Sequence, residues 1–121
     1  LETGLDAGET VMKFLAGFDT GGLGVNFDPA NLLMNHHDPY TSCQALQGRI
    51  VHVHAKDARK AGASRGAAEV PLGHGDLDWL KLIDLLHEQE YRGYLTIERE
   101  TGPASFQEGE QAVGFLRRLA R

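Results

Sequence analysis

The sequence is poor in cysteine, in long apolar runs and in excess positive charge, which argues against several protein classes. Its one cysteine, Cys43, has no partner for a disulfide, so we expect a reducing, cytoplasmic setting. Apolar runs stop after a few residues, far short of the ~20 that a membrane-spanning helix needs, so no membrane partner is expected. The 12 basic residues are outnumbered by 17 acidic ones, giving a net charge of −5. This balance argues against a protein that binds a nucleic-acid backbone.

The composition that remains is that of an ordinary globular domain. The 121 residues are 41% hydrophobic and 24% charged, which excludes a disordered tail, a collagen-like repeat and a coiled coil. The chain does not begin with methionine, and Leu1-Glu2 is typical of the end of a strand. We therefore expect residues 1–121 to form a single domain that is part of a longer chain.

Strand and helix patterns alternate along the chain. The apolar spacing predicts helices over 9–18, 30–34, 40–47, from Asp76 or Asp78 onward and after Ser105, and strands over 23–27, 49–55 and 94–97. This alternation predicts an α/β fold with a parallel sheet covered by helices. The polar, glycine-rich segment 56–75 is predicted to be a long loop, and a loop of that length usually has a function.

An ionisable residue lies at or next to the carboxyl end of each predicted strand. These residues are Glu2, Asp28, His54 and Glu98. In parallel α/β barrels the carboxyl ends of the strands open onto one face, which holds the active site. Three carboxylates and one imidazole on that face suit Mn²⁺, Mg²⁺ or Co²⁺, with Zn²⁺ as a less favoured ion.

Alternation along the strands supports the same grouping. Side chains in a strand point to opposite faces in turn. The polar face is predicted to hold Asn26, His52 and Thr96 beside the ionisable residues. The apolar face is predicted to hold Val25, Phe27, Val51, Val53 and Ile97.

Four segments together resemble a known family. They are Val25–Asn31, Val51–Asp57, Val70–Trp79 and Thr96–Glu100, and in this order they resemble the carboxyl-terminal half of the xylose-isomerase-like TIM barrels. The resemblance implies the second half of a (β/α)₈ barrel, with parallel strands and outer helices. The superfamily includes sugar phosphate isomerases and epimerases, ketose epimerases, inosose dehydratases and a DNA-repair endonuclease branch. The endonuclease branch is disfavoured because Asn31 replaces one of its metal ligands.

The resemblance also assigns roles to residues. It places metal ligands at Glu2, Asp28, His54 and Glu98, with His54 favoured over His52 as the second histidine of the His-Val-His motif. It makes Glu2 and Glu98 the catalytic residues that handle protons.

Four further residues are predicted to bind substrate. Asn31 stands where relatives often carry a histidine, and Lys60 stands where some epimerases carry an arginine. Lys56 and Arg59, just past the histidine strand, could bind hydroxyls or a phosphate.

The predicted function is that of a divalent-metal-dependent sugar or sugar-phosphate isomerase/epimerase, with Mn²⁺ as the favoured ion. It would abstract a proton beside a carbonyl and pass through an enediolate. The alternatives are a cyclitol (inosose-type) dehydratase of the same fold and a non-catalytic sugar-binding half barrel. The expected partner is a small sugar or sugar phosphate. Association with another copy is also expected, because open sheet edges invite pairing.

Overall fold

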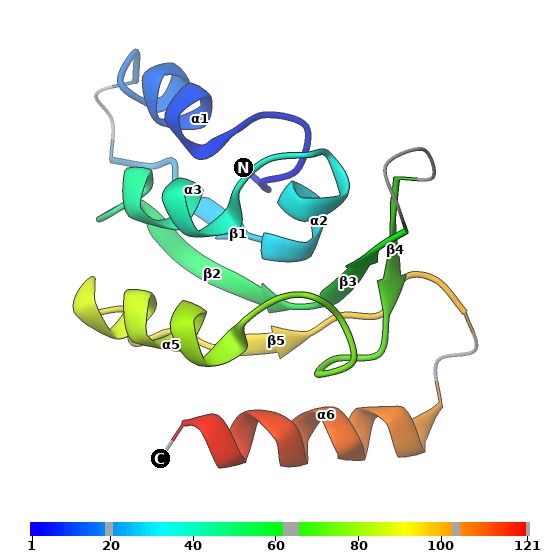
Figure 1. The fold of residues 1–121 in the computed structure, drawn as a ribbon. Helices are drawn as coiled ribbons and strands as arrows, with labels where there is room; N and C mark the ends of the chain where they lie inside the picture. Colours follow the sequence, from blue (N-terminus) through cyan, green and yellow to red (C-terminus); the bar gives the residue numbers. More distant parts are fainter. Residues whose placement is uncertain (19–20, 62–65, 103–104, 121) are drawn as a thin grey trace.

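The fold is a short parallel sheet with helices packed along its outer side (Figure 1). The computed structural model describes residues 1–18, 21–61, 66–102 and 105–120. The sheet has the order β1–β2–β5, formed by Val25–Phe27, Ile50–Ala55 and Leu95–Ile97, and both pairs of neighbours are parallel. Residues 1–3 extend it, because Glu2 bridges Asn26 in parallel and Thr3 N donates to Asn26 O at 3.0 Å. The predicted α/β fold with parallel strands is confirmed.

The helices form an outer layer against this sheet. They are α1 (Gly8–Leu15), α2 (Pro29–Met34), α3 (Pro39–Ala45), α5 (Trp79–Glu88) and α6 (Phe106–Leu119). Helix α3 packs against α1 and α5, and α6 packs against α5 and β5. No helix among the described residues is both long and apolar enough to cross a membrane.

The sequence explains where these helices begin. Asp28, Asp38, Asp78 and Ser105 each accept a hydrogen bond from a backbone N–H of the first turn, and Pro29 and Pro39 occupy first helical positions. Asp78, rather than Asp76, caps α5. The capping places Asp28 at the junction of β1 and α2, where it belongs to the rim of the sheet.

The core lies between the apolar face of the sheet and the helices. Its fully buried members include Val25, Phe27, Val53 and Ala55 from the strands and Leu32, Cys43, Trp79 and Leu82 from the helices. The alternation of faces is therefore confirmed for β1 and for the carboxyl-terminal half of β2. Val51 departs from the prediction, since 66% of its surface is exposed at the start of β2.

The predicted loop over 56–75 is wrong for residues 57–60 and 67–70, which form two strands. The chain continues from β2 into β3 (Asp57–Lys60), which pairs antiparallel with β4 (Ala67–Val70); residues 62–65 lie outside the described part. Aspartate, alanine, lysine and glutamate, which make up most of the two strands, are poor strand formers by propensity, so the hairpin depends on tertiary contacts. Figure 1 shows this hairpin at the carboxyl end of β2, beside the chain that leaves β5.

One buried carboxylate holds the connection after the hairpin. Asp57 is 1% exposed and accepts backbone hydrogen bonds from Ala58, Gly73, Gly75 and Leu77. Burial raises the pKa of Asp57, and these four donors oppose that rise. The result is a fixed turn over 71–77 that leads directly into α5.

Candidate metal centre

Four side chains converge at the carboxyl ends of the strands. Glu2, Asp28, His54 and Glu98 each offer a donor atom, and these atoms all lie within 4.8 Å of one another. Glu2 is bridged to β1, Asp28 follows β1, His54 lies in β2 and Glu98 follows β5. The prediction that these four residues meet at one rim is thus matched by their positions, and their role as ligands stays a prediction.

The His54 ring lies at the centre of this group. Its Nδ1 is 2.9 Å from Glu2 Oε1, 3.2 Å from Glu98 Oε2 and 3.5 Å from Asp28 Oδ2. A single ring nitrogen can donate only one hydrogen bond, so it cannot satisfy three carboxylates at once. A divalent cation among the same donors would attract all of them, and the donor set fits a hard ion such as Mg²⁺ or Mn²⁺.

Asp28 gives independent support for a cation at this point. Its side chain is fully buried, Oδ1 accepts from Asn31 N at 2.9 Å, and Oδ2 has no hydrogen-bond partner among the described residues. Burial raises the pKa of Asp28 to about 6, against the lowering effect of the Asn31 N–H, Lys56 and His54. An unpaired buried carboxylate oxygen is costly unless a ligand binds it.

The neighbouring backbone fixes Asp28 and Glu2 relative to each other. Thr3 Oγ1 donates to Asp28 O at 3.1 Å and accepts from Asp28 N at 2.8 Å, and Thr3 is 1% exposed. Asn26 Nδ2 lies between two of the four side chains, 3.4 Å from Glu2 Oε1 and 3.2 Å from His54 Nε2. The sequence prediction placed Asn26 on this face without giving it a role.

Lys56 is a buried cation beside the four residues. Its Nζ donates to Asn31 Oδ1 at 3.1 Å, to Glu98 Oε2 at 3.2 Å and to Glu100 Oε2. Burial alone would lower the pKa of Lys56, but the hydrogen bonds to Glu100 and Glu98 and the charge of Asp28 raise it above its ordinary value. The hydrogen bond from Lys56 lowers the pKa of Glu100. Lys56 therefore stays charged and offsets part of the negative charge of the site.

The exit from β5 is held by a residue that the sequence prediction missed. The Glu69 side chain, on β4, is 2% exposed, accepts from Arg99 at 2.7 Å, and also accepts from Glu100 N at 3.0 Å. These bonds tie the hairpin to the segment that carries Glu98 and Glu100. No sequence signal points to Glu69, because the polar, glycine-rich composition of segment 56–75 predicts a loop there.

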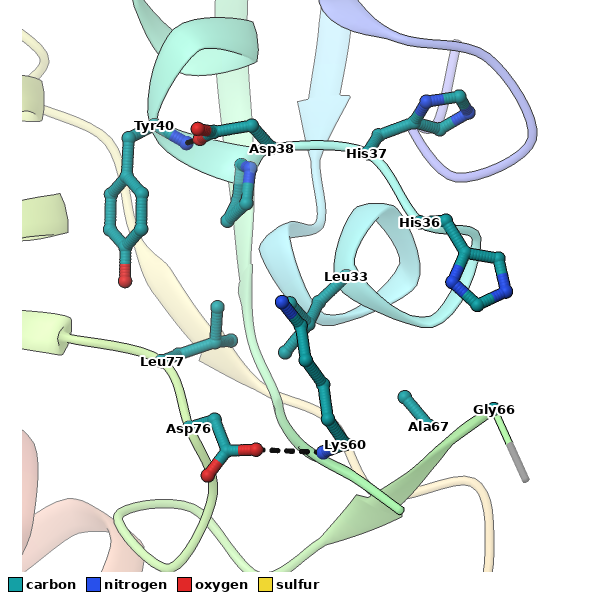
Figure 2. A pocket seen from close by; sticks show the side chains of 11 residues that line it. Leu33, His36, His37, Asp38, Tyr40, Lys60, Gly66, Ala67, Asp76 and Leu77 are labelled. Carbon is teal, nitrogen blue, oxygen red and sulfur yellow. Dashed lines mark hydrogen bonds between the residues drawn. The ribbon is translucent and has the colours of Figure 1, made fainter. Parts of the chain in front are cut away.

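The other predicted substrate residues are placed differently from one another. Asn31 lies beside the four residues: its backbone N–H donates to Asp28, and its side chain accepts from Lys56. The Arg59 guanidinium donates to the backbone carbonyl of His74 and, within the described part of the chain, forms no hydrogen bond or ion pair with any of the four residues. Lys60 lines a cavity of about 730 Å³ whose lining includes none of the four. Figure 2 shows the Lys60 side chain extending past Leu33 in this cavity, with its backbone N–H donating to Asp76 at 2.7 Å.

The fold and the rim together define a class: a parallel α/β barrel segment with a carboxylate–histidine group at the carboxyl ends of its strands. A family model described as "Xylose isomerase-like TIM barrel" matches residues 3–119. The chain therefore belongs to the xylose isomerase-like TIM barrel family, as the sequence motifs predicted.

Individual relatives agree with this assignment. The chain is 32% identical to a xylose isomerase domain protein from Planctomyces limnophilus, with a TM-score of 0.88 over 98% of this chain and 45% of that one. It is 29% identical over 125 residues to an inosose dehydratase from Clostridium tetani, covering 92% of this chain and 42% of the relative. A family protein from Mycobacterium smegmatis, solved in complex with magnesium, has a TM-score of 0.80 at 21% identity and covers 98% of this chain and 42% of that one.

The chain spans less than half the length of these relatives. It therefore corresponds to about half of a barrel, and β5 has β2 as its only strand neighbour among the described residues. Association with another copy stays a prediction.

Proposed function

We propose that this chain carries the metal-binding and proton-transfer groups of a divalent-metal-dependent enzyme, and that the reaction is dehydration of a keto-cyclitol of the inosose type. The observation that carries this proposal is the convergence of four donor atoms within 4.8 Å of one another, one of them from Asp28, whose buried Oδ2 has no hydrogen-bond partner among the described residues. The preference for dehydration over isomerisation or epimerisation is supported by the curated relatives, which are named inosose dehydratases.

The proposed holders of the cation are Glu2, Asp28, His54 and Glu98. When bound, it would act as a Lewis acid for negative charge that develops on a substrate carbonyl oxygen. Mn²⁺ remains the favoured ion, with Mg²⁺, Co²⁺ and Zn²⁺ as alternatives. Residues 1–121 would supply the carboxyl-terminal half of the barrel, and the rest of the substrate pocket would come from the other half.

Glu2 and Glu98 are the proposed acid and base. Their side chains are 46% and 28% exposed, so both carboxylates reach the open side of the rim while Asp28 stays buried. One carboxylate takes the proton from the carbon beside the carbonyl, and the electron pair of that C–H bond forms a carbon–carbon double bond. The C–O bond on the next carbon breaks, and the departing hydroxyl receives a proton from the other carboxylic acid and leaves as water.

The same two carboxylates support the second candidate function. If the proton returns to carbon instead, the product is an epimer or an isomer of the substrate and no water is lost. The sugar isomerase/epimerase prediction therefore differs from the dehydratase only in the fate of the deprotonated substrate.

The experiment uses the full-length protein loaded with Mn²⁺ and supplied with inosose or a panel of ketoses in D₂O, followed by NMR. Loss of water from inosose supports the dehydratase, while deuterium incorporation with all hydroxyls retained indicates an isomerase or epimerase. Glu98→Gln should abolish either reaction, and Glu88→Gln, at an exposed position of α5, should not. Binding of the ketone with no exchange and no water loss would contradict the enzyme proposal and favour a sugar-binding protein.

A further inference from the structure

A cavity of about 460 Å³ opens beside Glu2 and is separate from the cavity that Lys60 lines. Its walls are the segment 2–6, Val11 of α1, and two asparagines of α2 and its C-cap, Asn31 and Asn35. Glu2 lines this cavity and also belongs to the proposed metal centre, so the cavity adjoins that centre. A molecule bound at that centre would extend into it.

Hydrogen bonds to two other segments hold the wall formed by residues 2–6. Thr3 is locked to the backbone of Asp28 by the two bonds described above. His37 Nε2 donates to the carbonyl of Leu5 at 2.9 Å. Gly4 lies so close to α2 that a Cβ at this position would come 3.1 Å from Asn31 Cβ. The wall is therefore fixed at both ends and packed against α2.

The orientation of the Asn31 amide follows from its neighbour. Lys56 Nζ can only donate, so the atom 3.1 Å from it must be the amide oxygen, Oδ1. The Asn31 Nδ2 group is left without a hydrogen-bond partner among the described residues. Asn31 thus presents a donor to the cavity.

In Asn35 it is the amide nitrogen, not the oxygen, that is engaged in a hydrogen bond. Its Nδ2 donates to the backbone carbonyl of Asn31 at 2.9 Å, so Oδ1 is the atom without a partner in the described part of the chain. Positions four apart on a helix lie on the same face. The two asparagines that line the cavity therefore offer it one donor and one acceptor, and a hydroxyl group can satisfy both because it donates and accepts.

The charge of the cavity wall selects against anions. Its ionisable residues are Glu2 and Asp6, both acidic, and none of the lysines, arginines or histidines that the structure describes lines it. The ammonium of Lys56 has its three N–H bonds directed at Asn31, Glu98 and Glu100. A phosphate bound in the part of the cavity beyond the metal centre would lie near the Asp6 carboxylate and meet no basic side chain among the described lining residues, which is unfavourable at short range.

We propose that this cavity is a hydroxyl-binding subsite in which Asn31 Nδ2 donates and Asn35 Oδ1 accepts, and that the part of the substrate bound there is uncharged and polyhydroxylated. This rests on the proposed function, because the substrate would be anchored at the metal centre beside Glu2. Asn35 becomes a specificity-determining residue, and a phosphorylated substrate is excluded from this cavity. Val11 supplies an apolar wall for the C–H groups of the substrate.

The test compares two ketones on the Mn²⁺-loaded full-length protein by calorimetry. Inosose carries a full set of ring hydroxyls, whereas 2-hydroxycyclohexanone keeps only the carbonyl and one adjacent hydroxyl. Asn35→Ala should raise the Kd of inosose about three- to tenfold, the loss expected for one hydrogen bond, and leave the Kd of 2-hydroxycyclohexanone within twofold. Asn31→Asp, which keeps the acceptor for Lys56 and removes the donor, should act in the same direction. Gln44→Ala, exposed on α3, is the control.

The outcomes separate the subsite from the proposed function. If inosose binds and Asn35→Ala selectively weakens it while no turnover occurs, the subsite is supported and the proposed function fails. If turnover proceeds but Asn35→Ala affects both ketones equally, or neither, the subsite is overturned. Tighter binding of an inosose phosphate than of inosose would overturn the assignment of an uncharged substrate, as would a failure of inosose to bind at all.

Discussion

Lys56 Nζ lies 3.7 Å from Asp28 Oδ2, and both side chains are fully buried. This separation is too long for a hydrogen bond, so the carboxylate is attracted by the ammonium without being satisfied by it. The three N–H bonds of Lys56 are directed at other oxygen atoms. Asp28 therefore keeps one oxygen available on the side that faces Glu2, His54 and Glu98.

The first prediction concerns pH and the metal-free protein. Burial raises the pKa of Asp28 from 3.8 to about 6, so the folded state binds this proton more tightly than the unfolded state. The resulting stabilisation is complete below pH 4 and is lost as the pH rises through about 6. The shift corresponds to at most about 3 kcal/mol in the free energy of unfolding at pH 7.

Asp28→Asn tests this directly, because the amide cannot titrate and its oxygen can still cap α2. In the presence of a chelator, urea unfolding should show the variant gaining stability over the wild type between pH 4 and pH 7. Parallel curves for the two proteins across this range would contradict the prediction.

The second prediction concerns metal addition. A ligand that binds only the folded state stabilises it by about 2.7 kcal/mol at a concentration one hundred times its Kd. Mn²⁺ should therefore raise the melting temperature of the wild type, and a chelator should reverse the rise. His54→Gln should lose most of this response, whereas His74→Gln, at an exposed histidine, should keep it. An equal response in both variants would place the metal elsewhere.

The third prediction concerns the buried Asp57. Asp57→Ala leaves the backbone N–H groups of Ala58, Gly73, Gly75 and Leu77 without their acceptor. Each unsatisfied buried donor costs about 1–3 kcal/mol, so the loss of stability should be about 3 kcal/mol or more by urea denaturation. Asp84→Ala, at an exposed position of α5, should change stability by less than about 0.5 kcal/mol. Similar effects of the two variants would show that the turn is held by other contacts.

The fourth prediction compares two glycines. A Cβ at Gly75 would come 2.0 Å from Asp57 Oδ1 and 2.5 Å from Ala58 O, whereas a Cβ at Gly109 meets nothing within 4 Å. Gly75→Ala should therefore disrupt the turn and lower the melting temperature sharply. Gly109→Ala, inside α6, should stabilise the protein by about 0.5–1 kcal/mol because alanine favours the helix. A tolerated Gly75→Ala would mean that the turn relaxes easily.

Much of the site could be predicted because it depends on local rules. Asp28 and His54 come at the ends of apolar strands, and the carboxyl ends of parallel strands meet at one face. Residue identity and strand order were enough to group these residues with Glu2 and Glu98. The prediction needed no knowledge of how the helices pack.

The rest depends on contacts between distant segments. The β3–β4 hairpin has weak strand propensity and forms where Glu69 meets Arg99 and the backbone of Glu100, 30 residues and more along the chain. The sequence predicts a substrate contact for Lys56, yet its fully buried position follows from oxygen atoms on two other segments, the start of α2 and the chain after β5. The amide orientations of Asn31 and Asn35 likewise follow from hydrogen bonds that no local pattern encodes.

All four donor atoms come from the contiguous stretch between Glu2 and Glu98, and the buried ammonium beside them lies in it as well. A gene fusion or recombination that replaced everything outside this stretch would leave the four proposed ligands together. If these residues hold a cation as proposed, such a chimera would keep the cation site and take the rest of its substrate pocket from the newly joined half.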